Sequence, residues 1–230
     1  MTTNHGVRHL GIIMDGNRRW AKRRGLPTLE GHRRGYATFK KAGDWCLKRG
    51  IEILTVYAFS TENWNRSKKE VGYLMRLLEQ ALTRDLGEIH RKNIRILVIG
   101  RMKELPLRLQ KRISEAMELT KKNTRGTLQL AINYGGRAEI VDAMKRVYRS
   151  AKSASHITEA SISEAMYTAG QPDPDLIIRT SGEQRTSGFL AWQGVYSELL
   201  FTDRMWPEFT ERDLDAALSE FKRRQRRFGA

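Results

Sequence analysis

The chain has 230 residues, 40% of them hydrophobic, which is enough for one substantial core, and nothing in that length requires a second domain beyond 1–230. Lysine and arginine number 42 against 26 acidic residues, and the formal charge of +16 indicates an anionic partner: nucleic acid, an anionic membrane surface or a small polyphosphate. The single cysteine, Cys46, excludes an internal disulfide, and no run reaches the ~18 apolar residues of a spanning helix, so we expect a cytoplasmic protein with at most peripheral membrane contact.

Short β-rich apolar runs alternate with longer segments of helical period. This alternation predicts an α/β fold, a single domain with a central, mostly parallel sheet of about six strands flanked by helices. The expected strands are 9–14, 51–59, 94–99, 127–133, 175–179 and the shorter run 198–202. In open parallel sheets, ligands bind beyond the carboxyl ends of the strands, so the residues directly after each strand are the candidate site.

Two helices have clear start signals. Ser67 and Glu70 have the spacing of a capping box ahead of an apolar helix face that runs from Val71 to Leu82. Thr210 has the position of a cap for the last helix, which leads into a basic tail.

The first candidate motif follows the strand 9–14. It joins a carboxylate, a glycine turn and two guanidinium groups: Asp15, Gly16, Asn17, Arg18, Arg19 and Trp20. Glycine lets the backbone approach phosphate oxygens, arginines donate to them, and a carboxylate holds Mg²⁺ through hard oxygen ligands. This composition indicates a diphosphate cradle, although an ordinary Asp-Gly turn followed by solvated arginines would have the same sequence.

The second motif is the polar and aromatic loop after the second strand, which contains Ser60, Glu62, Asn63, Trp64 and Arg66. Asn63 and Glu62 could orient a proton or a water, Arg66 could hold a phosphate, and Trp64 could wall an apolar substrate. A capping loop with a packed tryptophan is the alternative interpretation.

The third motif, after the fifth strand, sets Arg179 and Arg185 with hydroxyl groups, including Ser187, around two glycines. It is typical of a second anion site. No Gly-x-x-x-x-Gly-Lys-Ser/Thr occurs in the chain, so nucleoside triphosphate hydrolysis lacks its best support. Farther on, Glu198 stands beside an apolar run, where a surface or capping acid is the ordinary interpretation.

Together these motifs resemble the cis-prenyltransferase family, and especially its undecaprenyl diphosphate synthases. The resemblance covers nearly the whole chain, and it is carried by HLGIIMDGNRRW (9–20), Gly31-His32, YAFSTENWNR (57–66), NYGGR (133–137), IRTSGEQR (178–185), Trp192-Gln193, YSEL (196–199) and FTD (201–203). It implies the family's fold, a homodimer, and a transferase that condenses isopentenyl diphosphate with an allylic prenyl diphosphate. The expected product is a Z-polyprenyl diphosphate, a lipid carrier precursor, made by Mg²⁺-assisted ionisation, condensation and elimination.

The resemblance also assigns roles. Asp15 is implied as the catalytic, Mg²⁺-engaging carboxylate, Asn63 as a helper in proton removal, and Glu198 as a second metal-linked acid that acts from the neighbouring subunit. The implied substrate-binding residues are Gly16, Asn17, Arg18, Arg19, Trp20, His32, Ser60, Glu62, Trp64, Arg66, Arg179, Arg185 and Ser187. The closing Arg227–Gly229 is similar to an element that reaches across the dimer.

Several positions depart from the best-known bacterial pattern, among them Arg18, which stands where glycine is common, and Thr28, which stands where an arginine often binds phosphate. These departures bear on substrate preference. The growing hydrocarbon needs an apolar channel, for which the helix from Val71 to Leu82 is a candidate wall, and Gly126 leaves little bulk near the far end.

Two other functions compete with this one. A nucleic-acid-binding protein would explain the +16 charge, but the chain has no recognisable recognition module, and we expect no nucleic-acid partner. A non-catalytic partner subunit of a heteromeric prenyltransferase would explain the resemblance, but the retained Asp15, Asn63 and Arg179 argue against it.

Overall fold

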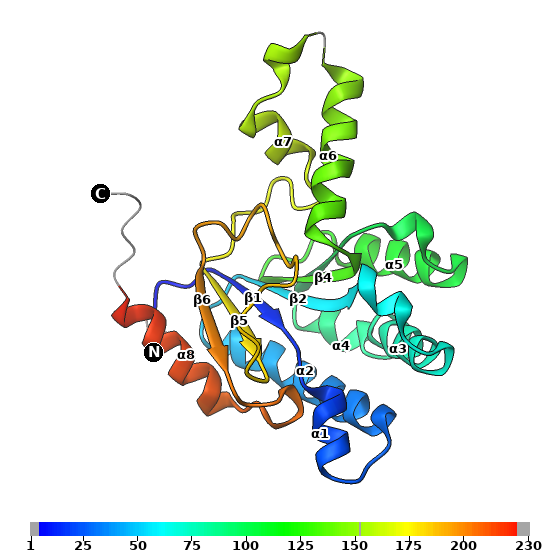
Figure 1. Cartoon of the computed structure of the whole chain (residues 1–230), viewed down its shortest axis with the longest axis vertical. Coiled ribbons are helices and arrows are strands. Elements are labelled where there is room, and N and C mark those ends of the chain that lie inside the picture. Colours follow the sequence, from blue (N-terminus) through cyan, green and yellow to red (C-terminus); the bar gives the residue numbers. More distant parts are fainter. Residues whose placement is uncertain (1–4, 152, 225–230) are drawn as a thin grey trace.

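The computed structural model describes residues 5–151 and 153–224, and its centre is one six-stranded sheet (Figure 1). The strand order is β3-β4-β2-β1-β5-β6, and every neighbouring pair is parallel. The strands are β1 (His9–Ile13), β2 (Ile53–Ser60), β3 (Ile94–Ile99), β4 (Gly126–Tyr134), β5 (Leu176–Thr180) and β6 (Glu198–Thr202). All six predicted strands are confirmed, with ends within two residues of the expected ones.

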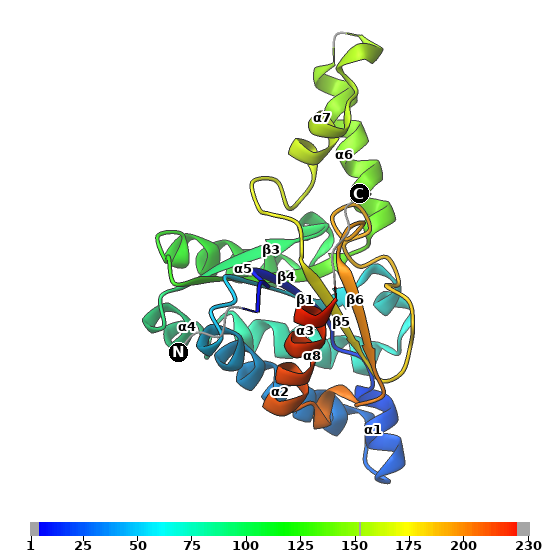
Figure 2. The same cartoon turned by 90° about the vertical axis from the view of Figure 1, so that its left-hand side faces the viewer.

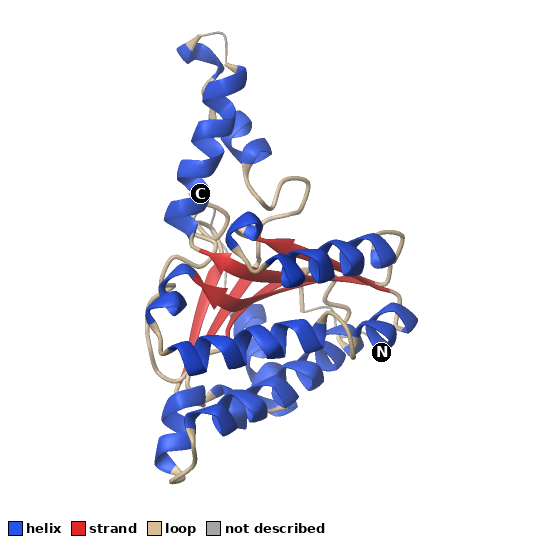
Figure 3. Cartoon of the chain, turned by 90° about the vertical axis from the view of Figure 1, so that its right-hand side faces the viewer, coloured by secondary structure: helices blue, strands red, loops and turns tan. Residues whose placement is uncertain are grey.

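Helices cover the sheet and extend from it (Figure 3). They are α1 (Asn17–Arg23), α2 (Thr28–Lys48), α3 (Lys68–Ala81), α4 (Leu86–Arg91), α5 (Leu107–Thr120), α6 (Gly136–Ser150), α7 (Glu159–Ala165) and α8 (Glu211–Arg223). Figures 1 and 2 show α6 and α7 projecting away from the rest of the molecule. Over the described ranges, no helix is long and apolar enough to cross a bilayer.

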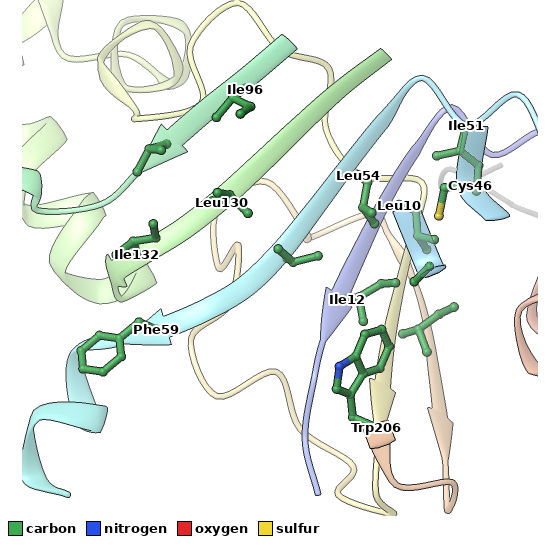
Figure 4. Close-up of a cluster of buried hydrophobic side chains, with 14 of the residues drawn as sticks. Leu10, Ile12, Cys46, Ile51, Leu54, Phe59, Ile96, Leu130, Ile132 and Trp206 are labelled. Carbon is green, nitrogen blue, oxygen red and sulfur yellow. The ribbon is translucent and has the colours of Figure 1, made fainter. Parts of the chain in front are cut away.

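The main core lies on one face of the sheet, because alternate strand residues point to opposite sides. Leu10 and Ile12 of β1 are fully buried there, and side chains of α2, α3, α4, α5 and α8 join the same cluster (Figure 4). Cys46 belongs to it, as expected of a small buried residue. The other face carries a smaller cluster that includes Phe189 and Leu190. The sheet is therefore packed on both faces, and its edge beyond the strands is left for a site.

The predicted caps of α3 and α8 differ in how far the structure confirms them. Thr210 forms a complete capping box with Asp213. Ser67 accepts from the backbone N–H of Glu70 at 3.3 Å, but the Glu70 carboxylate does not return to Ser67, so the predicted box is wrong in its second half. The reason is a stronger set of partners for this carboxylate inside the site.

The packing of α1 on α2 generates a stability prediction. A methyl group on Gly31 would lie 2.1 Å from the backbone oxygen of Asn17, whereas one on Gly43, also in α2, would meet nothing within 4 Å. We expect Gly31→Ala to lower the free energy of unfolding by about 1–3 kcal/mol through overpacking. Gly43→Ala is the matched control and raises it by up to about 1 kcal/mol through helix propensity. Guanidinium unfolding measures both, and equal effects would contradict the packing argument.

Candidate active site

Asp15 follows β1 at the carboxyl edge of the sheet, and backbone geometry fixes it there. Its N–H donates to Thr180 Oγ1 (2.9 Å), the same hydroxyl donates to its carbonyl (2.7 Å), and Gly16 N–H donates to Oδ1 (2.7 Å). Gly16 has φ of 102°, and an added Cβ would lie 2.7 Å from Ser181 Oγ. A glycine is required here on both counts, and the second oxygen of Asp15 remains for the site.

Arg179 supplies the charge opposite Asp15. β1 and β5 pair with Ile13 beside Arg179, so the arginine side chain reaches the residue just past β1, and its Nη2 donates to Asp15 Oδ2 at 3.0 Å. The other terminal nitrogen donates to the Arg185 carbonyl and to Ser187 Oγ (2.8 Å). The first and third motifs therefore meet within one chain.

Two further arginines lie close to this pair, bridged by a glutamate. Arg19 Nη2 lies 3.5 Å from Asp15 Oδ2, and Arg19 Nη1 donates to Glu183 at 3.0 Å. The other Glu183 oxygen pairs with Arg185 at 2.6 Å. Asp15 and Glu183 thus keep three guanidinium groups close together.

The second motif forms a short 3₁₀ turn, Thr61–Asn65, at the end of β2. Asn63 Oδ1 accepts from Ser60 N–H (3.2 Å) in a capping box, and Trp64 donates to Asn133 and packs edge-on against Phe59. The capping interpretation is therefore correct, and Trp64 packs rather than lining the cavity. Ser60, Glu62 and Asn63 of the same turn do line it, so one turn has both roles.

A cavity of about 800 Å³ runs from this polar mouth into an apolar interior. Nine of the predicted residues line it: Asp15, Asn17, His32, Ser60, Glu62, Asn63, Arg66, Arg179 and Ser187. Deeper in, the lining is apolar, with Phe39 from α2, Val56 from β2, and Leu74 and Leu78 from α3. The helix predicted as a channel wall is therefore one wall of this cavity.

Glu70 is a site residue that the sequence does not reveal. Its side chain is buried and accepts from Arg66 Nη1 (2.9 Å), lies 3.0 Å from His32 Nε2, and is 3.9 Å from Arg18 Nε. Burial raises the pKa of Glu70, but the hydrogen bond with His32 and the charges of Arg66 and Arg18 outweigh it, and the net pKa is lowered. Burial lowers the pKa of His32 despite this partner, so the imidazole is neutral at pH 7.

Trp20 and Glu198 lie away from this cavity. Trp20 is buried against Met205 and donates to Glu208 at 3.0 Å. Glu198 begins β6, at the opposite end of the parallel strands from Asp15, and pairs with Arg224 at 2.9 Å. Asp15 and Glu198 therefore do not meet within one chain, and a role for Glu198 in the partner's site stays a prediction. Arg227–Gly229 lie outside the described residues.

Known proteins of similar sequence and structure agree with this geometry. Residues 13–229 match the model of the family described as "Putative undecaprenyl diphosphate synthase". The chain belongs to this prenyltransferase family. It is 46% identical to the isoprenyl transferase of Thermotoga maritima over 96% of both chains. It is also 46% identical to a Micrococcus luteus ditrans,polycis-undecaprenyl-diphosphate synthase described as (2E,6E)-farnesyl-diphosphate specific, over 96% of this chain and 91% of that one.

A solved structure of the family supports the fold. Lavandulyl diphosphate synthase from Lavandula x intermedia, in complex with dimethylallyl diphosphate, superposes with a TM-score of 0.94 at 38% identity, covering 99% of this chain and all of that one. The present chain is thus a cis-prenyltransferase in fold and family, and its polar mouth and apolar cavity are the arrangement that a prenyl diphosphate requires.

The Glu70 cluster generates a prediction for this prenyltransferase. Glu70→Ala leaves Arg66 and the His32 ring without their shared partner, and we expect the free energy of unfolding to fall by about 1–3 kcal/mol. The pKa of His32 falls further, since the Glu70 contact opposes the effect of burial. NMR titration of His32 and denaturant unfolding measure the two effects.

The matched control is Glu79→Ala on the same helix, where the partner Arg108 is exposed. Loss of this surface ion pair changes the unfolding free energy by at most about 1 kcal/mol and leaves the pKa of His32 unchanged. Equal losses of stability in the two variants would contradict the special role of Glu70.

Proposed function

We propose that the chain condenses isopentenyl diphosphate with an allylic prenyl diphosphate to make a Z-polyprenyl diphosphate. The observation that carries the proposal is the pairing of Asp15 with Arg179, at 3.0 Å, at the mouth of an apolar cavity. A carboxylate beside guanidinium groups suits a diphosphate with its cation, and the apolar interior suits a prenyl chain.

Two diphosphate positions follow from the two sides of this pair. The starter diphosphate is proposed to bind the side of Asp15, with Gly16, Asn17, Arg18, Arg19 and His32, while Trp20 supports this side through its packing on Met205. Isopentenyl diphosphate is proposed to bind the side of Arg179, with Arg185 and Ser187. The turn with Ser60, Glu62 and Asn63, together with Arg66, is proposed to close over both, and Trp64 anchors this turn against Phe59.

Magnesium is the proposed cofactor, and the donor set fits a substrate-dependent ion. In the described part of the chain, no group of three or more His, Cys, Asp or Glu side chains could hold a metal. Mg²⁺ commonly takes one or two carboxylates and completes its shell with substrate phosphates and water, so Asp15 is a sufficient protein ligand beside two diphosphates. When bound, the ion neutralises charge on the departing diphosphate.

The protein's own contribution is positioning and charge. Arg19 and Arg179 disperse the negative charge that the leaving group takes from the allylic carbon. The apolar walls exclude water from the cation that develops there, while the double bond of isopentenyl diphosphate attacks. Asn63, whose oxygen already accepts from Ser60 N–H, is proposed to orient the group that removes the final proton.

Turnover by the purified chain tests this function. With farnesyl diphosphate, labelled isopentenyl diphosphate and Mg²⁺, we expect polyprenyl product, and none after chelation of the metal. Asp15→Asn lowers kcat by about 10²–10³, the scale for removing one electrostatic contact to the transition state. Asp142→Asn, which breaks an ion pair with Arg101 outside the cavity, is the matched control and keeps kcat. No turnover with any allylic starter would favour the non-catalytic subunit.

A homodimer is proposed as the working form. Val141 and Tyr148 of α6 are exposed, and so are Val195 and Tyr196, in the segment just before β6. The residues just before this segment pack on α6 and α7, since Gln193 donates to Glu139 (3.2 Å) and Trp192 donates to Ser163 (3.0 Å). Exposed apolar side chains on a projecting element are typical of a subunit interface, and Glu198 directly follows the exposed segment.

Complementation tests the role of Glu198 across the dimer. Asp15→Asn and Glu198→Gln are each expected to lose nearly all activity. A heterodimer of the two, isolated with two different tags, has one site with both acids intact and recovers about half of the unaltered activity. A dimer of two tagged Asp15→Asn chains is the control. If the heterodimer stays inactive, Glu198 does not serve the partner's site.

A cytoplasmic location with peripheral membrane contact completes the proposal. The exposed corner between α1 and α2 carries Lys22, Arg23 and Arg34, of which Lys22 and Arg23 form no ion pair among the residues described, and Leu26 is exposed beside them. Clustered cations next to an apolar side chain favour an anionic bilayer, the destination of a lipid product.

A further inference from the structure

The apolar cavity ends at a partition, and a second, smaller cavity lies behind it. The cavity with the polar mouth measures about 800 Å³, and the one behind it about 80 Å³. Three residues line both: Tyr36 and Phe39 of α2, and Ala81 at the end of α3. Since Ala81 is small, the two rings provide most of the material between the cavities.

Tyr36 is held in the partition from two sides. Its hydroxyl donates to Asp85, whose other oxygen pairs with Lys40 at 2.7 Å. Its ring lies 6.0 Å from that of Phe39 in a tilted pair. Burial, and then the hydrogen bond to Asp85, raise the pKa of Tyr36, so the phenol stays protonated and remains a donor. The ring is therefore anchored by a charge-assisted hydrogen bond and by packing.

The smaller cavity has an apolar floor and a charged rim. Leu47, Leu54 and Leu128 are among its lining residues. Lys92 pairs with Asp44 (2.6 Å) and Glu88 (2.7 Å), and Lys40 lies 3.6 Å from Glu88. A hydrocarbon chain that passed Tyr36 would meet these leucine side chains, whereas the ion pairs stand along the rim of the cavity.

We propose that Tyr36, latched to Asp85, ends the hydrocarbon channel and limits the length of the product. This inference rests on the proposed function and adds a specificity-determining residue to it. Each condensation pushes the tail of the chain five carbons deeper, until the tail meets the anchored ring. Further growth then requires displacement of a packed aromatic side chain and loss of its hydrogen bond, so elongation slows at that length.

The sequence suggests that Gly126 lies near the far end of the hydrocarbon channel, but the structure places it beyond Tyr36. It lines the smaller cavity behind the partition, where a Cβ would lie 3.1 Å from Leu47 Cδ2. The space that it leaves cannot accept hydrocarbon while Tyr36 blocks the way. Its effect on product length should therefore depend on the residue at position 36.

Mass spectrometry of the product tests the partition, with farnesyl diphosphate, isopentenyl diphosphate and Mg²⁺ as substrates. Tyr36→Ala joins the two cavities, and we expect the main product to gain at least one five-carbon unit. Tyr36→Phe keeps the ring and loses the latch, and we expect a broader distribution that extends to longer products. Unchanged product length in Tyr36→Ala overturns the proposal, and an unchanged distribution in Tyr36→Phe overturns the role of the Asp85 hydrogen bond.

A double variant and a control keep the result specific. Gly126→Leu alone should leave the product unchanged, whereas in the Tyr36→Ala background it should return the product toward its original length. Tyr73→Ala, on α3 and outside both cavities, should have no effect on length. Circular dichroism and the melting temperature establish that each variant folds. If the unaltered chain makes no polyprenyl product, the proposed function fails; if it does and Tyr36→Ala matches it, only this inference fails.

Discussion

The ion pair between Arg179 and Asp15 is the interaction on which the site depends. Arg179 is only 6% exposed, and a buried guanidinium without a partner would cost about 3–5 kcal/mol. Its carboxylate partner comes from a different strand, and the parallel register that sets Ile13 beside Arg179 brings the two within 3.0 Å. A slip of one residue would turn the arginine to the other face of the sheet, so sheet pairing and site geometry are one constraint.

The acids at the mouth have a second consequence for binding. Three arginines close together would repel one another, and Asp15 and Glu183 offset that repulsion in the free protein. A diphosphate offers oxygens of the same charge and hydrogen-bonding type as these carboxylates. A diphosphate can therefore replace the two carboxylates as the partner of the arginines, and each guanidinium group then still has a negative charge beside it. The positive charge of these three arginines is thus partly offset before substrate binds.

The polar half of the site could be predicted from the sequence, and so could the sheet. Asp15 follows β1, Ser60 and Arg179 lie in the last residues of β2 and β5, and parallel strands present their carboxyl ends at one edge whatever the strand order. By contrast, no start signal or apolar pattern singled out helix α6 in the sequence, although it is 15 residues long. The spacing of Glu70 from Ser67 predicts that its carboxylate completes a capping box. Only the fold shows that His32 and Arg66 bind this carboxylate instead. The spacing of neighbouring residues cannot predict that Glu70 has a partner, His32, that is 38 residues away in the sequence.

The apolar half of the site was harder to foresee for a physical reason. Helical periodicity shows that Phe39 and Leu78 point inward, but a side chain that lines a cavity and one that fills a core obey the same periodicity. The difference lies in how closely α2 and α3 approach each other, which depends on small residues such as Ala81 and on anchors such as Tyr36. The mouth must keep its charges to bind two diphosphates, whereas these inner residues touch only hydrocarbon. Product specificity can therefore change along the inner walls while the chemistry at the mouth stays the same.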